Sequence, residues 1–141
     1  MDMDNKRHMG ALGEESAARY LMEKGFRIVC RNRSSRWGEI DIAALDSKWI
    51  IFAEVKTRTG YGYGNPEESI DADKADRIRK AAMLFLAEKG LWGQRPVRFD
   101  IISIIIDRKK LERCLRQAAG MEGLAASYSK FSCLEHIVDA F

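Results

Sequence analysis

The chain reads Glu39-Ile40-Asp41-Ile42-Ala43-Ala44-Leu45 and, three residues later, Trp49-Ile50-Ile51-Phe52-Ala53-Glu54-Val55-Lys56. Both stretches are rich in apolar and β-branched residues, which favour strands. The short segment between them has the composition of a tight turn. The pattern therefore predicts a β-hairpin whose second strand is central and covered on both faces.

Four charged side chains of this hairpin are expected to converge. Side chains alternate along a strand, so Glu54 and Lys56 share one face, and Glu39 and Asp41 share one face of the neighbouring strand. With Ser47-Lys48 as a two-residue turn, Asp41 lies opposite Glu54 and Glu39 lies opposite Lys56.

Two carboxylates that face each other beside an apolar run repel and are also desolvated. A divalent cation with oxygen ligands removes that repulsion, and Mg²⁺ takes one or two carboxylates plus waters and phosphate oxygens. A nearby lysine can orient or deprotonate an attacking water. This arrangement is typical of a metal-dependent nuclease. The alternative is a surface ion-pair ladder in which Glu39 pairs with Lys56 and Asp41 with an arginine.

The pattern outside the hairpin indicates an α/β protein. Helices are expected over residues 14–24 and 73–89, closed by Gly25 and Gly90, and further strands over 26–30 and 98–106. Residues 32–36 and the glycine-rich residues 59–66 are expected to be loops. Beyond residue 107 we expect a helix over 109–119, an irregular stretch over 120–130 and a short closing element over 136–141.

A chain of 141 residues fits a single domain spanning residues 1–141. We expect residues 1–10 to be a loose tail and residues 107–135 to be an insertion or a C-terminal extension. The three cysteines show no paired spacing, which favours a reducing, cytoplasmic setting. No apolar run approaches the ~20 residues that span a bilayer, so we expect no membrane partner. A lone histidine such as His136, close to a terminus, is expected at the surface.

A net charge of +3 supports a nucleic-acid partner only weakly, so local clusters matter more. We interpret five residues as candidate nucleic-acid contacts: Arg33, Ser35, Arg36, Arg58 and Lys74. The alternative for each is a purely structural position on a solvated face, at a helix edge or in a turn. The tyrosines of Tyr61-Gly62-Tyr63 could stack on bases, or the stretch is only a loop tip.

The sequence resembles the YraN-like family of small, uncharacterised bacterial proteins. The resemblance rests on Gly13-Glu14-Glu15, Arg31-Asn32 and Gly38-Glu39-Ile40-Asp41-Ile42-Ala43, and on three later pieces. Those are Phe52-Ala53-Glu54-Val55-Lys56-Thr57-Arg58, Arg98-Phe99-Asp100 and the ending His136-Ile137-Val138-Asp139-Ala140-Phe141, with Lys74 early in the long helix.

The resemblance implies a restriction-endonuclease-like core, with a mixed central β-sheet flanked by helices, as in archaeal Holliday-junction resolvases. It implies that Asp41 and Glu54 are ligands of Mg²⁺ or Mn²⁺ and that Lys56 is the catalytic lysine. An acid on the first helix completes such a site. Glu14 projects onto the sheet-facing side of that helix, whereas Glu15 is expected to point to solvent. The other interpretation of Glu14 is a first-turn acid favoured by the helix dipole.

The resulting hypothesis is a metal-dependent nuclease, with Glu39 as an accessory acid. Its substrate is nucleic acid, DNA ahead of RNA. The alternative is a non-catalytic nucleic-acid-binding module with a nuclease-like fold, and a third interpretation is a protein-interaction scaffold that uses the C-terminal segment. The sequence leaves open whether the chain forms a homodimer.

Overall fold

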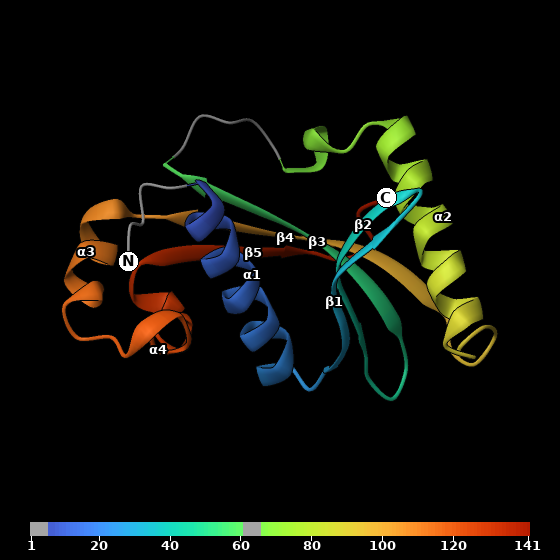
Figure 1. Cartoon of the computed structure of the whole chain (residues 1–141), viewed down its shortest axis with the longest axis horizontal. Coiled ribbons are helices and arrows are strands. Elements are labelled where there is room, and N and C mark those ends of the chain that lie inside the picture. The colour runs from blue at the N-terminus through green and yellow to red at the C-terminus, as the bar shows by residue number, and fades with distance from the viewer. Residues whose placement is uncertain (1–5, 61–65) are drawn as a thin grey trace.

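The structure, a computed structural model, describes residues 6–60 and 66–141 (Figure 1). One mixed sheet holds five strands in the order β1-β2-β3-β4-β5. The β3–β4 pair is parallel, and the other three pairs are antiparallel. The strands are β1 (Arg27–Ser35), β2 (Gly38–Leu45), β3 (Ile50–Thr59), β4 (Val97–Ile106) and β5 (Ser132–Ile137).

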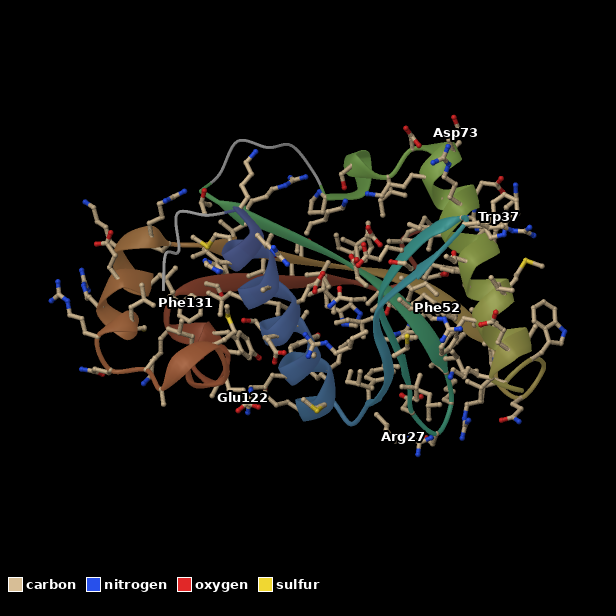
Figure 2. The ribbon with its side chains drawn as sticks, viewed as in Figure 1. Arg27, Trp37, Phe52, Asp73, Glu122 and Phe131 are labelled. Carbon is tan, nitrogen blue, oxygen red and sulfur yellow. The ribbon has the colours of Figure 1, made fainter. Side chains whose placement is uncertain are left out.

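Helices cover both faces of the sheet, which confirms the predicted α/β class. They are α1 (Lys6–Glu23), α2 (Ala72–Glu88), α3 (Arg108–Leu115) and α4 (Gly120–Ala126), with short 3-10 turns η1 (Pro66–Ser69) and η2 (Tyr128–Lys130). One buried cluster joins α1, α3 and α4 to the sheet, and a second joins α2 to the opposite face. Figure 2 shows Phe131 beside α3 and α4, and Phe52 toward α2.

The β2–β3 hairpin has the predicted register. Leu45 pairs with Ile50, and the ladder continues to the pair of Ile42 and Ala53. The Asp46 N–H donates to the Trp49 carbonyl at 3.1 Å, and the Asp46 carboxylate accepts the backbone N–H groups of Lys48 and Trp49 at 2.9 and 2.7 Å. An aspartate thus closes a turn that contains no glycine, because its side chain binds the turn's free N–H groups.

The first helix is longer than predicted. It begins at Lys6, and Met9 is buried in the core cluster of α1, so residues 6–10 are helical rather than part of a loose tail. The glycines Gly10 and Gly13 weaken the local helical signal, but packing of the apolar side against the sheet outweighs it. The predicted stop is confirmed, since Gly25 has a φ of 93°.

The first strand is also longer than predicted. Residues 32–35 are strand rather than loop, because β1 pairs with β2 as far as Ser35 and Gly38. The Ser35 hydroxyl donates to the Gly38 carbonyl at 3.0 Å and accepts the Trp37 N–H at 3.2 Å. These bonds close the β1–β2 turn.

The C-terminal segment is built into the same core. Residues 120–126 form α4 rather than an irregular stretch, and β5 begins at Ser132, before the predicted closing element. Leu111, Leu124 and Phe131 are at most 2% exposed and belong to the cluster under α1. Residues 107–135 therefore supply part of the hydrophobic core.

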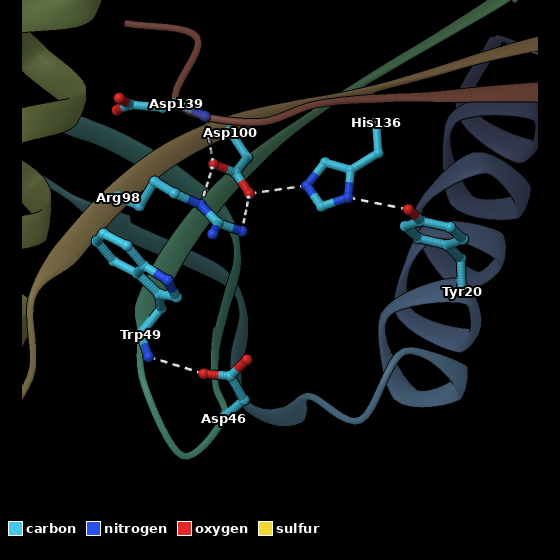
Figure 3. Close-up of polar contacts among 7 residues, drawn as sticks. All are labelled: Tyr20, Asp46, Trp49, Arg98, Asp100, His136 and Asp139. Atoms are coloured by element: carbon cyan, nitrogen blue, oxygen red, sulfur yellow. Dashed lines mark hydrogen bonds and ion pairs between the residues drawn. The ribbon is translucent and has the colours of Figure 1, made fainter.

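A buried carboxylate ties four parts of the fold together (Figure 3). Asp100 on β4 is fully buried, and its oxygens accept from Arg98 at 2.9 and 2.8 Å and from the Asp139 N–H at 2.9 Å. His136 Nε2 lies 2.7 Å from Asp100, and His136 Nδ1 lies 2.9 Å from the Tyr20 hydroxyl on α1. The expectation that His136 is at the surface is wrong, since its side chain is 11% exposed.

Hydrogen bonding keeps this buried aspartate charged. Burial alone would raise the pKa of Asp100, but the bonds from His136 and Arg98 outweigh it and lower the pKa.

In the described part of the chain, no helix is both long and apolar enough to cross a membrane.

Candidate active site

Asp41 and Glu54 line one cavity of about 510 Å³ between the β2–β3 hairpin and the start of α2. Glu39, Lys74 and Trp37 line it as well, and the side chains of Arg36 and Lys80 lie over the Trp37 ring. The structure thus brings three of the predicted acidic side chains and one predicted cation into one cavity.

Asp41 lies one residue beyond the last β2–β3 pair, where the strands separate. Its Oδ2 accepts the Val55 N–H at 2.9 Å, so the side chain takes the place of a backbone acceptor. Burial raises the pKa of Asp41, although this N–H bond and the charge of Lys56 act to lower it. The carboxylate is therefore fixed in place but poorly solvated.

Glu54 faces two lysines and one acid. Its Oε1 lies 3.5 Å from Lys74 Nζ and 3.9 Å from Lys56 Nζ, and its side chain is 12% exposed. Burial, followed by the charge of Asp41, raises the pKa of Glu54 to about 7, although both lysines act to lower it. Glu54 thus lies close to half-protonated at neutral pH, and a cation would favour its charged form.

Lys56 shares the face of β3 that carries Glu54. Burial and the neighbouring Lys74 lower the pKa of Lys56 to about 8, even though Glu54 and Asp41 act to raise it. A neutral lysine amine can accept a proton, so this residue is suited to general-base work near neutral pH. The ion pair described for Lys56 is with Glu54, not with Glu39 as the ladder alternative proposed.

Glu14 approaches Asp41 and Glu54 from the α1 side of the sheet. Gly13, next to it, packs directly on β3, where a Cβ atom would overlap the Thr57 hydroxyl and lie 2.8 Å from Thr57 Cβ. Burial raises the pKa of Glu14, a hydrogen bond with Asn32 lowers it, and the charge of Asp41 raises it again. The glycine therefore allows the close approach that puts Glu14 within electrostatic range of Asp41.

Sequence reasoning assigned no role to Asn32, which hydrogen-bonds to Glu14 from a backbone with a φ of 50°. A non-glycine residue in this left-handed region is uncommon and costs about 1–3 kcal/mol, so it often marks a functional site. The expectation that Glu15 points to solvent is wrong, because it pairs with Arg31 at 2.6 Å and both side chains are 32% exposed. No local sequence pattern reveals these contacts.

The predicted nucleic-acid contacts divide into two groups. Arg33 pairs with Glu88 and lies over the ring of Phe85, Arg36 lies over Trp37, and Ser35 closes a turn. These three have structural partners near α2. Lys74 reaches the Glu54 carboxylate, and Arg58 lies on β3 four residues beyond Glu54. Tyr61 and Tyr63 lie outside the described residues.

The residues present fit a two-carboxylate cation site. No group of three or more His, Cys, Asp or Glu side chains converges on a metal centre within residues 6–60 and 66–141. Asp41 and Glu54, however, supply two adjacent hard oxygen ligands, and burial raises the pKa of both. Mg²⁺ often takes one or two carboxylates and completes its shell with water and phosphate oxygens.

Comparison with known proteins places these residues in a matched region. A family model described as "Uncharacterised protein family UPF0102" matches residues 13–104, which include Glu14, Asp41, Glu54, Lys56 and Lys74. A UPF0102 protein of Rhodococcus jostii (strain RHA1) is 49% identical over 98 residues, 70% of this chain and 82% of the relative. A UPF0102 protein of Moorella thermoacetica is 37% identical over 123 residues, 87% of this chain and 97% of the relative.

Proposed function

We propose that this chain, which belongs to the uncharacterised protein family UPF0102 (the YraN-like family), is a divalent-metal-dependent nuclease that hydrolyses phosphodiester bonds, with DNA ahead of RNA as substrate. One observation carries the proposal. Asp41 and Glu54 are adjacent, half-buried or buried carboxylates with raised pKa values, and Lys56 beside them has a lowered one. Such opposed shifts of neighbouring groups are typical of acid–base sites.

The arrangement of the strands supports a restriction-endonuclease-like core. An antiparallel hairpin carries the acids, a parallel strand follows it in the sheet, and α1 and α2 lie on opposite faces. We propose this fold type on those features together with the resemblance of the motifs.

Asp41 and Glu54 would hold Mg²⁺ or Mn²⁺, which would neutralise the pair and polarise the scissile phosphodiester. Lys56 would take a proton from the attacking water as the oxygen–phosphorus bond forms in line with the bond that breaks. Lys74, 3.5 Å from Glu54, would bind a non-bridging phosphate oxygen. Glu14, held by Asn32, would orient water on the α1 side.

The test is a single-turnover cleavage assay on duplex, single-stranded and branched DNA and on RNA, with Mg²⁺ and with Mn²⁺. Because general-base catalysis contributes about 10²–10⁴-fold, Lys56→Ala should slow cleavage at least about 100-fold and change substrate affinity less than about threefold. Lys48→Ala is the matched control, since Lys48 is an exposed lysine at the other end of the hairpin.

Cleavage at an unchanged rate in Lys56→Ala would contradict the assigned role. An intact protein that binds these substrates with either cation and cleaves none of them would favour the non-catalytic binding module instead.

A further inference from the structure

A second cavity, of about 480 Å³, lies where β3 and β4 end and α3 begins. Four basic side chains line it, from the start of α3 and from η2: Arg108, Lys109, Lys110 and Lys130. Except for Thr59 and Gly60, its lining residues lie beyond residue 104, where the match to the family model ends. The cavity is thus separate from the site around Asp41 and Glu54.

Basic side chains outnumber acidic ones four to one in the lining of this cavity. Asp107 lies among the lining residues, but its Oδ1 accepts the Lys110 N–H at 3.1 Å and so caps α3. Lys109, Lys110 and Lys130 are exposed. The ten residues 107–116 hold five basic and two acidic side chains, whereas the whole chain has a net charge of only +3. A cavity of this kind favours an anion.

The cavity lies at the strand ends and reaches both faces of the sheet, including the face that carries Glu54 and Lys56. Glu54, Lys56 and Arg58 alternate along one face of β3, and Arg58 pairs with Ile105 on β4. Ile105 pairs in turn with Cys133 on β5, and both of these residues line the cavity. Directly paired residues share a face, so Ile105 and Cys133 lie on the face of Glu54, whereas Ile106 and Ser132, which also line the cavity, lie on the other.

Strand β3 also sets the distance between them. Thr59, which borders the cavity, lies five positions beyond Glu54, and a strand rises about 3.3 Å per residue, giving about 16 Å between them. In Figure 1, β3 and β4 run from the side of α2 toward that of α3. Phosphates of one DNA strand follow each other every 3.4 Å along the duplex axis, so this distance corresponds to about five base pairs.

We infer that the basic cavity binds backbone phosphate of a nucleic-acid duplex whose cleaved phosphodiester lies at Asp41 and Glu54. The inference rests on the proposed function for the position of the cleaved bond, but not for the phosphate contact itself. A substrate should then extend about five base pairs from the bond toward α3.

The experiment compares two double variants that remove the same charge from residues 107–116. Lys109→Gln with Lys110→Gln removes two of the four basic side chains that line the cavity, and Arg113→Gln with Arg116→Gln removes two exposed arginines of the same segment that do not line it. Fluorescence anisotropy measures the Kd for a 20-base-pair duplex and a 4-base-pair duplex with Ca²⁺ in place of Mg²⁺. Hydrolysis of thymidine 5′-p-nitrophenyl phosphate reports the active site alone.

The cavity variant should weaken binding of the longer duplex about tenfold or more, with a salt slope smaller by about one, and the arginine variant should weaken it less than about twofold. Neither should change binding of the short duplex or hydrolysis of the small substrate. Lys130→Gln, from a different segment, should act in the same direction as the cavity variant.

Equal losses in both double variants would show a general charge effect and overturn the inference, as would an intact protein that binds no duplex. A specific loss in the cavity variant of a protein that hydrolyses no phosphodiester would support the phosphate contact and reject the proposed nuclease. Normal hydrolysis of the small substrate without a specific loss of duplex binding in the cavity variant would support the proposed nuclease and reject the phosphate contact.

Discussion

Glu54 is the residue at which burial and function conflict most clearly. Its pKa is raised from 4.5 to about 7, so the folded protein prefers the protonated side chain. Stability from this preference is fully present below pH 4.5 and is lost as pH rises through about 7. Without a cation, the folded protein should therefore become less stable between those two values.

Replacing Glu54 by glutamine should remove that cost, because the amide cannot ionise. Since one pKa unit corresponds to about 1.4 kcal/mol, we expect Glu54→Gln to raise the free energy of unfolding by roughly 1–3 kcal/mol at pH 8 and by much less at pH 5. Urea denaturation in EDTA at both pH values measures this difference.

Glu122→Gln, at an exposed acid on α4, is the control and should change stability by less than about 0.5 kcal/mol at either pH. A Glu54→Gln protein that is less stable than the intact one at pH 8 would show that the carboxylate is satisfied in the absence of metal.

At the scale of elements, the hairpin was predictable and the first helix only partly so. Alternation along β2 and β3 and the short turn between them fix the register, so Asp41, Glu54 and Lys56 could be assigned to one site from nearby residues. The start of α1 could not be predicted, because Gly10 and Gly13 obscure the helical periodicity and only packing on the sheet makes the additional turn favourable.

The two glycines of α1 should respond to alanine in opposite ways. An added Cβ on Gly10 meets nothing within 4 Å, so Gly10→Ala should stabilise the helix by about 0.5–1 kcal/mol. On Gly13 it would overlap Thr57, and Gly13→Ala should destabilise the protein by about 1–3 kcal/mol and slow cleavage by displacing Glu14.

Urea denaturation of both variants provides the measurement, and each serves as the control for the other. Equal effects of the two substitutions would mean that α1 does not pack on β3 through Gly13.

At the scale of the whole molecule, the contacts that hold the fold together join distant parts of the chain. Tyr20, Asp100 and His136 are joined by hydrogen bonds across 116 residues, and no local pattern could pair them. No local pattern could pair Asn32 with Glu14 either, because their hydrogen bond depends on how α1 crosses the sheet. The helix predicted over 109–119 is confirmed in part by α3, which ends at Leu115. Helix α4 was not predicted, because its short apolar stripe becomes interpretable only beside α1.

The proposed nuclease requires above all a cation held by Asp41 and Glu54. The most direct test titrates the protein with Mn²⁺ at pH 7.5 and follows free Mn²⁺ by electron paramagnetic resonance. Asp41→Asn is compared with Asp107→Asn, which alters an exposed acid distant from the pair and keeps a side chain able to cap α3. The account predicts one Mn²⁺ site per chain, weakened at least about tenfold in Asp41→Asn and unchanged in Asp107→Asn. An Asp41→Asn protein that binds Mn²⁺ with the affinity and stoichiometry of the intact protein would contradict it.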